Sequence, residues 1–284
     1  SPRGVFVSGR YAYVAASGTA RLTVVDVSNP ASPVVAGSVS DSTYMDDAWS
    51  VFVSGRYAYV VGHTFGTSRL AVVDVSNPAS PVVVGSTASG NIEIGLSVFV
   101  SGRYAYVASN SNSTVKVVDV NNNFGLGSLK IVGSVSVTVA GSLFASGRYL
   151  YVANTGSGGT NTFYVLDISS PASPGIVGRI SSTEDFCSKS ASTQLPNTVF
   201  ASGRYVYVTS AGCTGTGDAL TIVDVLGSDL SSASVGSVSA GSVQVADLLD
   251  VGDHANIRGG LNVGPGGVYS QGSLSVFDTN SAAA

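Results

Sequence analysis

The sequence predicts an all-β fold, a β-propeller of four-stranded antiparallel blades, and three observations predict it. The string VFVSGRYAYV begins at Val5, and close copies begin at Val51, Val98, Leu143 and Val199. A second string of the type LTVVDV follows each copy, and no segment has the apolar spacing of a helix. Only 11% of the residues are charged and 35 are glycine, which is typical of β-structure with many tight turns.

The second repeat shows how one unit forms a blade. Four strands are expected, at residues 51–54, 56–61, 70–75 and 82–86. Gly55 permits a tight turn between the first two, and the two prolines of residues 76–81 exclude that stretch from a strand ladder. Apolar residues occupy both faces of these strands, which suits a blade packed between two neighbours. A β-sandwich, the alternative, does not require so regular a repeat.

The repeats divide the chain into a propeller over residues 1–241 and a C-terminal β segment over residues 242–284. The segment lacks the SGRY string, although LSVFDT at 274–279 resembles the third-strand string. It is either a degenerate sixth blade or a stalk, because GGLNVGPGGVYSQGSLSV resembles the repeats of fibres that are often trimeric. Five blades followed by a stalk-like segment are preferred, since each of the five units has four strands of its own. A homo-oligomer through this segment is then expected.

The strings RYAYV and LTVVDVSNPASPV resemble the LVIVD repeat, a family of β-propeller repeats common in bacterial and archaeal surface proteins. The resemblance covers residues 5–241 and is looser in the fourth and fifth units. It implies the propeller architecture and an extracellular or cell-surface location. It implies no single activity.

Each unit carries an arginine where its second strand starts and an aspartate where its third strand ends. These two ends meet at one rim of a blade, so we expect one ion pair with a structural role in each unit. The expected pairs are Arg10 with Asp26, Arg56 with Asp74, Arg103 with Asp119, Arg148 with Asp167, and Arg204 with Asp224. The aspartate can instead hold the turn that follows it, and five equivalent ligand sites are the functional alternative.

The loops that differ between units are expected to carry function, because shared residues serve the scaffold. They lie at the opposite rim and are rich in carboxylates and aromatic rings. Such groups suit a carbohydrate, whose hydroxyls donate to acids and whose C–H faces stack on rings. A solvated loop surface is the alternative. The candidate ligand-binding residues are Asp41, Tyr44, Asp46, Asp47, Trp49, His63, Phe65, Glu93, Glu184 and Asp185.

The same acids could also bind calcium through oxygen ligands. However, DSTYMDD lacks the residue order of a calcium loop, so no metal site and no other cofactor is predicted. Cys187 and Cys213 lie in loops of this rim, and a disulfide between them is expected against two free cysteines. A disulfide would suit an oxidising, extracellular location.

The sequence excludes several classes of function. Nucleic-acid binding is not expected without a cluster of basic residues, nor membrane insertion without a long apolar run. No motif of a metalloprotease, serine hydrolase or phosphate loop stands in the right context. The preferred function is a non-enzymatic recognition or adhesion head that binds a glycan or protein. The alternatives are a passive structural module of a surface fibre and a carbohydrate-active enzyme, a glycosidase or a lyase.

Overall fold

The computed structural model of the chain describes residues 1–225 apart from 65, 112, 122–123, 139, 155–160, 183–197 and 214–216. The chain divides into two compact units, Ser1–Ser228 and Asp229–Ala284, and the described residues all belong to the first. The predicted boundary at residue 241, the stalk and the sixth blade therefore lie outside the described residues. Within the described part, no helix is long and apolar enough to cross a membrane.

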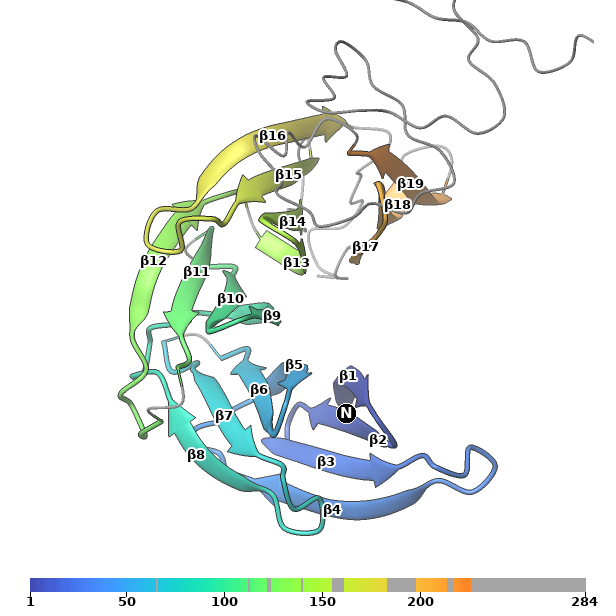
Figure 1. Cartoon of the computed structure of the whole chain (residues 1–284), viewed down its shortest axis with the longest axis vertical. Coiled ribbons are helices and arrows are strands. Elements are labelled where there is room, and N and C mark those ends of the chain that lie inside the picture. The colour runs from blue at the N-terminus through green and yellow to red at the C-terminus, as the bar shows by residue number, and fades with distance from the viewer. Residues whose placement is uncertain are drawn as a thin grey trace, which may run out of the picture. The chain divides into compact units, whose positions relative to one another are not determined.

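The described elements are all β-strands, and they form five separate sheets (Figure 1). The first sheet contains β1 (Pro2–Ser8), β2 (Tyr11–Ala16), β3 (Arg21–Asp26) and β4 (Val34–Ser40). The second contains β5 (Ala48–Ser54), β6 (Tyr57–Gly62), β7 (Leu70–Asp74) and β8 (Val82–Ser86). The third contains β9 (Gly95–Ser101), β10 (Tyr104–Ser109), β11 (Thr114–Asp119) and β12 (Ile131–Ser136). The fourth contains β13 (Ala140–Ser146), β14 (Tyr149–Asn154), β15 (Asn161–Asp167) and β16 (Gly175–Ser182), and the fifth β17 (Val199–Ser202), β18 (Tyr205–Cys213) and β19 (Gly217–Asp224).

Each sheet is a blade whose strands pair antiparallel in chain order. The first strands of consecutive blades pack side by side, β1 on β5, β5 on β9, β9 on β13 and β13 on β17 (Figure 1). The first strand of a blade is therefore the innermost and the fourth lies at the outer edge. This arrangement confirms the predicted all-β propeller of five blades, of which the fifth has three described strands.

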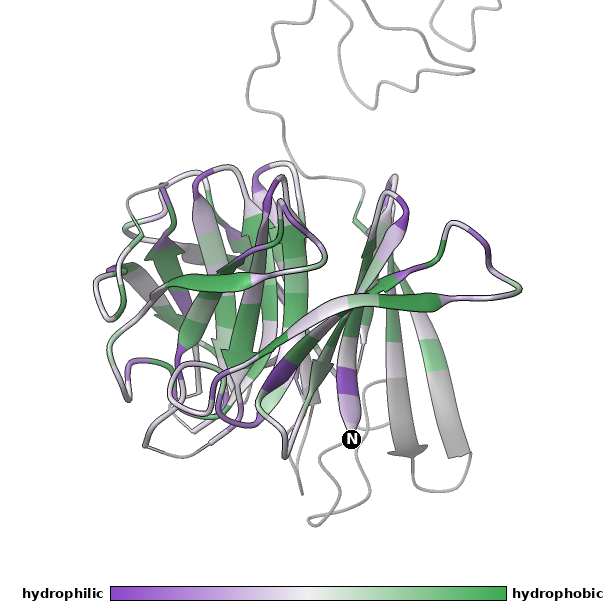
Figure 2. Cartoon of the chain, turned by 90° about the horizontal axis from the view of Figure 1, so that it is seen from below, coloured by the Kyte–Doolittle hydropathy of each residue, from purple (hydrophilic) through white to green (hydrophobic). Residues whose placement is uncertain are grey.

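The blades are held together by apolar side chains on both faces of the strands. Figure 2 shows the apolar residues along the strands and the polar residues in the loops at the rims. An aromatic row crosses all the inner strands, with ring centres 4.6–5.2 Å apart. Its members are Phe6, Phe52, Phe99, Phe144 and Phe200. Neighbouring blades thus explain why both faces of each strand are apolar.

The two end blades each keep one uncovered face. Val51 and Val53 of the second blade are 6% and 5% exposed, because the first blade packs against them. Their counterparts Val5 and Val7 are 66% and 59% exposed, and Phe200 of the fifth blade is 54% exposed. These two faces carry the same apolar residues that are buried between blades elsewhere, but no described blade packs against them.

A second contact between blades uses the loop after the third strand. In the first blade a β-bulge in β4 turns Gly37 towards the SNPASP loop of the second blade. A Cβ atom at Gly37 would lie 2.4 Å from the carbonyl oxygen of Pro78. Gly133 stands in the same relation to Pro171, at 2.2 Å. Glycine at this position is therefore a packing requirement.

Candidate functional site

Two rims of the propeller carry different kinds of residue. We call the rim with the loops that follow the third strands, among them 27–33 and 75–81, the repeated rim. We call the opposite rim, with loops 17–20, 41–47, 63–69, 87–94 and 110–113, the variable rim. Each predicted site residue that the structure describes lies at or next to one of these rims.

The repeated rim contains all five of the predicted Arg–Asp pairs. Arg56 donates to Asp74 Oδ2, while Asp74 Oδ1 accepts the backbone N–H of Ser76 at 2.9 Å. The aspartate thus serves the ion pair and the turn together. The hydrogen bonds from Arg56 and Ser76 hold the pKa of Asp74 at about 2. Each arginine also lies over the ring of the following tyrosine, with 5.2 Å between Arg56 Cζ and the ring centre of Tyr57.

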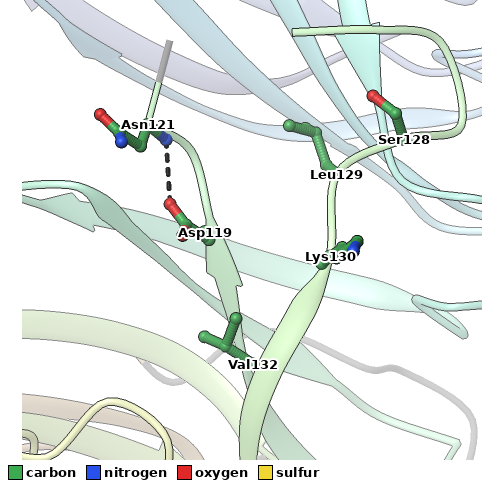
Figure 3. Close-up of a pocket in the computed structure, with 6 residues that line it drawn as sticks. All are labelled: Asp119, Asn121, Ser128, Leu129, Lys130 and Val132. Atoms are coloured by element: carbon green, nitrogen blue, oxygen red, sulfur yellow. Dashed lines mark hydrogen bonds between the residues drawn. The ribbon is translucent and has the colours of Figure 1, made fainter. Parts of the chain in front are cut away.

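The repeated rim of the third blade has a hollow of about 300 Å³ beside Asp119 (Figure 3). Asp119 accepts the backbone N–H of Asn121 at 3.0 Å and the guanidinium of Arg103, so the scaffold already uses it. Residues 124–130 lie where the first two blades have the SNPASP loop, and they strap this blade to Ser86 of β8 in the second. Gly127 N–H donates to Ser86 Oγ at 2.8 Å within this strap. We interpret the hollow as a consequence of the strap.

Asp47 joins two loops of the variable rim. One carboxylate oxygen accepts the backbone N–H of Gly18 at 3.2 Å, and the other lies 3.6 Å from His63 Nδ1. Its φ of 47° matches the φ of 46° at Ile94, which holds the corresponding position in the next blade. The strained backbone therefore belongs to the scaffold, and both oxygens of Asp47 have partners within the protein.

Trp49 lies in a strand and not in the predicted loop, because β5 begins at Ala48. A β-bulge makes Trp49 the extra residue between Ala48 and Ser50. Its indole stacks on the His63 ring, with 4.0 Å between ring centres and 18° between planes. The guanidinium of Arg3, the bulge residue of β1, lies 4.4 Å from the indole centre. Protein groups thus already occupy the predicted platform for sugar stacking.

Asp46 is the carboxylate of this loop with more capacity for a ligand. It is half-buried, and one of its oxygens accepts Thr67 Oγ1 at 3.4 Å. Close by in the fold, Arg69 lies over the ring of Tyr44 at 5.3 Å and donates to the carbonyl of Thr87 at 3.4 Å. Loops 41–47 and 63–69 therefore together present the carboxylate of Asp46, the hydroxyl of Thr67, the phenol of Tyr44 and the guanidinium of Arg69.

Asp41 shapes the loop in which it lies. Its Oδ1 accepts the backbone N–H groups of Thr43 at 2.9 Å and Tyr44 at 3.2 Å. This is the hydrogen-bond pattern of a turn-forming aspartate. We therefore assign Asp41 to the local structure and not to a ligand.

Glu93 and Lys116 form the next part of the variable rim. Ser109 Oγ donates to the Glu93 carbonyl at 2.8 Å and accepts the Glu93 N–H at 3.2 Å, which fixes the loop and leaves the carboxylate out of these bonds. Lys116 Nζ donates to the carbonyl of Asn91. Burial lowers the pKa of Lys116, and the charge of Glu93 acts in the opposite direction.

Four predicted residues lie outside the described ones: Phe65, Glu184, Asp185 and Cys187. Cys213 is in β18, but the predicted disulfide cannot be placed without Cys187 and stays a prediction. Among the described residues, no group of three or more His, Cys, Asp or Glu side chains is arranged to hold a metal ion. The sequence interpretation missed Arg3, Thr67, Arg69 and Lys116. The sequence could have indicated Lys116, because the other four units carry an uncharged residue at the corresponding position of the third strand.

Five stretches of the chain match the LVIVD repeat: residues 1–41, 46–89, 96–136, 139–182 and 197–238. The chain belongs to the LVIVD repeat family. The family resemblance expected from the strings is thereby confirmed. No curated protein matches this LVIVD chain.

Solved structures resemble the LVIVD propeller at low sequence identity. Hydrazine synthase of Kuenenia stuttgartiensis is 18% identical, with a TM-score of 0.59 over 78% of this chain and 62% of its own. The periplasmic gluconolactonase PpgL of Pseudomonas aeruginosa is 19% identical, with a TM-score of 0.54 over 79% of this chain and 70% of its own. A putative 6-phosphogluconolactonase from Bacteroides uniformis is 13% identical, with a TM-score of 0.57 over 78% of this chain and 66% of its own.

These likenesses establish the shared fold and correct one expectation. The LVIVD chain spans about three fifths to seven tenths of the three structures. The prediction that the chain is not an enzyme is corrected, because propellers of this fold include the gluconolactonase PpgL and a putative 6-phosphogluconolactonase, so the fold is compatible with catalysis. The absence of a familiar catalytic motif was the basis of that prediction, and it is a weak basis in a propeller, where loops from several blades build a site.

Proposed function

We propose that this LVIVD propeller binds a hydroxyl-rich, carbohydrate-type ligand on its variable rim. One observation carries the proposal. The Arg–Asp pairs of the repeated rim recur in every blade, and the two charges of each pair neutralise each other. No charge of the variable rim recurs in every blade: Asp46 and Glu93 hold one position in two consecutive blades, Arg21 and Arg69 hold another, and Lys116 occurs in one blade. Charges that the scaffold does not repeat in every blade are the ones available for recognition.

The chemistry of the variable rim fits hydroxyl groups. A carboxylate offers about four lone-pair positions, and Thr67 takes one of those on Asp46. Sugar hydroxyls donate to the remaining positions and accept from Arg69 or Lys116. Because Arg3 and His63 already contact Trp49, the proposal relies on hydrogen bonds and not on stacking against the indole.

The binding test compares one substitution on each rim. Asp46→Asn keeps the shape and removes the charge on the variable rim, while Asp74→Asn does the same on the repeated rim. We expect ligands found on a glycan array to lose about tenfold affinity for Asp46→Asn, the loss of roughly one charge-assisted hydrogen bond. Asp74→Asn should bind as the wild type does. Equal binding by both variants, or no glycan bound by the wild type, would contradict the proposal.

Hydrolysis of sugar lactones is the second candidate, and the shared fold with the gluconolactonase PpgL and the putative 6-phosphogluconolactonase favours it. In this reaction Asp46 accepts a proton from water, and the water oxygen adds to the lactone carbonyl. The ring C–O bond then breaks, and the departing alkoxide takes a proton to give a hydroxy acid. A positioned base contributes about 10²–10⁴-fold to such a rate.

The catalytic test measures acid release from glucono-1,5-lactone above the spontaneous rate. We expect the wild type to accelerate ring opening and Asp46→Asn to lose about a hundredfold of that acceleration. Asp74→Asn is again the control. A wild-type rate equal to that of buffer excludes this second candidate and leaves the binding proposal to its own test.

An extracellular role towards a glycan or protein partner remains part of the proposal.

A further inference from the structure

A hollow at the junction of the third and fourth blades has a different chemistry from the rest of the variable rim. It measures about 470 Å³ and lies where the ends of β11 and β12 face β15 and β16. Its polar lining comes from Ser113, Ser136, Thr138, Tyr164 and Arg179. It therefore presents four hydroxyls and one guanidinium, and no carboxylate of the described residues lines it.

The tyrosine and the arginine form a cross-strand pair that is peculiar to the fourth blade. Tyr164 on β15 pairs with Arg179 on β16. The corresponding pairs in the first three blades are Thr23 with Ser38, Ala71 with Ser86, and Lys116 with Ser134. Serine thus satisfies the scaffold at the position of Arg179. The arginine is not required by the fold.

The charge of Arg179 is not used within the described structure. The five arginines of the repeated rim each pair with an aspartate, whereas the side chain of Arg179 makes no ion pair and no hydrogen bond with the described residues. It is also exposed, so its guanidinium is accessible to a ligand.

The tyrosine, in contrast, is held in place. Tyr164 is 5% exposed, and its Oη lies 2.7 Å from Thr138 Oγ1 and accepts the Thr138 N–H at 3.2 Å. The hydroxyls of Tyr164 and Thr138 are thereby fixed in the lining that they share with the exposed arginine. A guanidinium and ordered hydroxyls are donors that match a carboxylate, phosphate or sulfate.

We propose that this hollow, which we call the Arg179 hollow, binds a small oxyanion group carried by a hydroxylated molecule, with Arg179 supplying the charge. This second site does not depend on the function proposed for Asp46, because inorganic anions are sufficient to test it. Phosphate, sulfate and acetate probe the anion alone, glucose probes the hydroxyls alone, and gluconate combines the two.

The test follows ¹⁵N–¹H spectra of the full chain during titration with each probe. We expect saturable shifts at the Thr138 amide and the Arg179 side chain with phosphate, sulfate and gluconate. Glucose should produce weaker ones. Gluconate binding tighter than acetate would show that the ligand's hydroxyls contribute; equal affinity would limit the proposal to the anion and overturn its second part.

The decisive variant is Arg179→Ser, which restores the residue of the first three blades and so keeps the fold. Its matched control is Lys130→Ser, which removes an exposed cation from the repeated rim. We expect Arg179→Ser to weaken phosphate binding at least tenfold, about 1.4 kcal/mol, and Lys130→Ser to leave it unchanged. An equal loss in both variants, or no saturable shift with any anion, would overturn the proposal.

Discussion

The two rims of the propeller are built by the same repeat and have opposite uses of charge. On the repeated rim, each blade pairs an arginine with an aspartate, and in the first four blades the aspartate also holds the turn that follows it. On the variable rim, the corresponding loops differ in length and composition: Asp46 and Glu93 share one position in two blades, and Lys116 and Arg179 each appear once. The comparison teaches that a charge recurring in every unit reports on the fold, whereas a charge missing from most units is the better indicator of a ligand.

The strongest test of the repeated rim as scaffold concerns the glycine under each SNPASP loop. We expect Gly37→Ala to lower the free energy of unfolding by about 2–3 kcal/mol, because the new Cβ would lie 2.4 Å from a backbone oxygen that cannot easily move. The corresponding Gly178→Ala should cost little, since among the described residues its Cβ would meet only the Val165 side chain at 3.6 Å. Urea unfolding measures both. Equal losses would show that contact between blades does not explain the glycine.

A smaller effect separates the rims by charge. Asp74→Asn removes the ion pair with Arg56 and weakens the turn, and we expect the Tm to fall by about 1–3 °C, since the arginine is largely solvated. Asp46→Asn should leave the Tm unchanged, because its hydrogen bond to Thr67 is long. Scanning calorimetry of the two variants measures both Tm values. A greater loss for Asp46→Asn would reverse the assignment of scaffold and site.

The repeated rim also predicts the direction of the pH dependence. Hydrogen bonds from Arg56 to Asp74 and from Arg148 to Asp167 hold the pKa of each carboxyl at about 2, below its value of about 3.9 in the unfolded chain. Their contribution is complete above that unfolded value and is lost as the pH falls towards 2. We therefore expect the Tm to be nearly constant from pH 7 to about 5 and to fall below it. Asp74→Asn should make this fall shallower, and an unchanged slope would contradict the assignment.

The smallest expected effect is spectroscopic. Trp49 is the only tryptophan of the chain, so its fluorescence reports on the variable rim alone. Arg3→Ala removes the guanidinium from the indole, and we expect a red shift of the emission as water reaches the ring. Arg10→Ala, on the repeated rim, should leave the spectrum unchanged. A shift in the Arg10 variant instead would mean that the two rims are not independent.

The sequence alone was sufficient for the features that recur. Five copies of one string predict five blades, and the position of Arg56 and Asp74 at strand ends predicts their contact, because antiparallel strands bring those ends together. Features that occur in one blade were harder to predict from the sequence. Trp49 was expected in a loop, since the β-bulge that extends β5 to Ala48 depends on register and leaves no clear mark in the residues.

Tertiary structure alone decided how the variable rim is used. Asp41, Asp46 and Asp47 are equivalent in the sequence, yet the first holds its own turn, the third joins two loops, and only Asp46 keeps most of its capacity for a ligand. Likewise, the role proposed for Arg179 depends on Tyr164 across the sheet and on Thr138, which lies on the connection between β12 and β13. The physical reason is that repeats encode local pairing within a blade, whereas the partners of a rim side chain come from neighbouring blades and depend on how the blades pack.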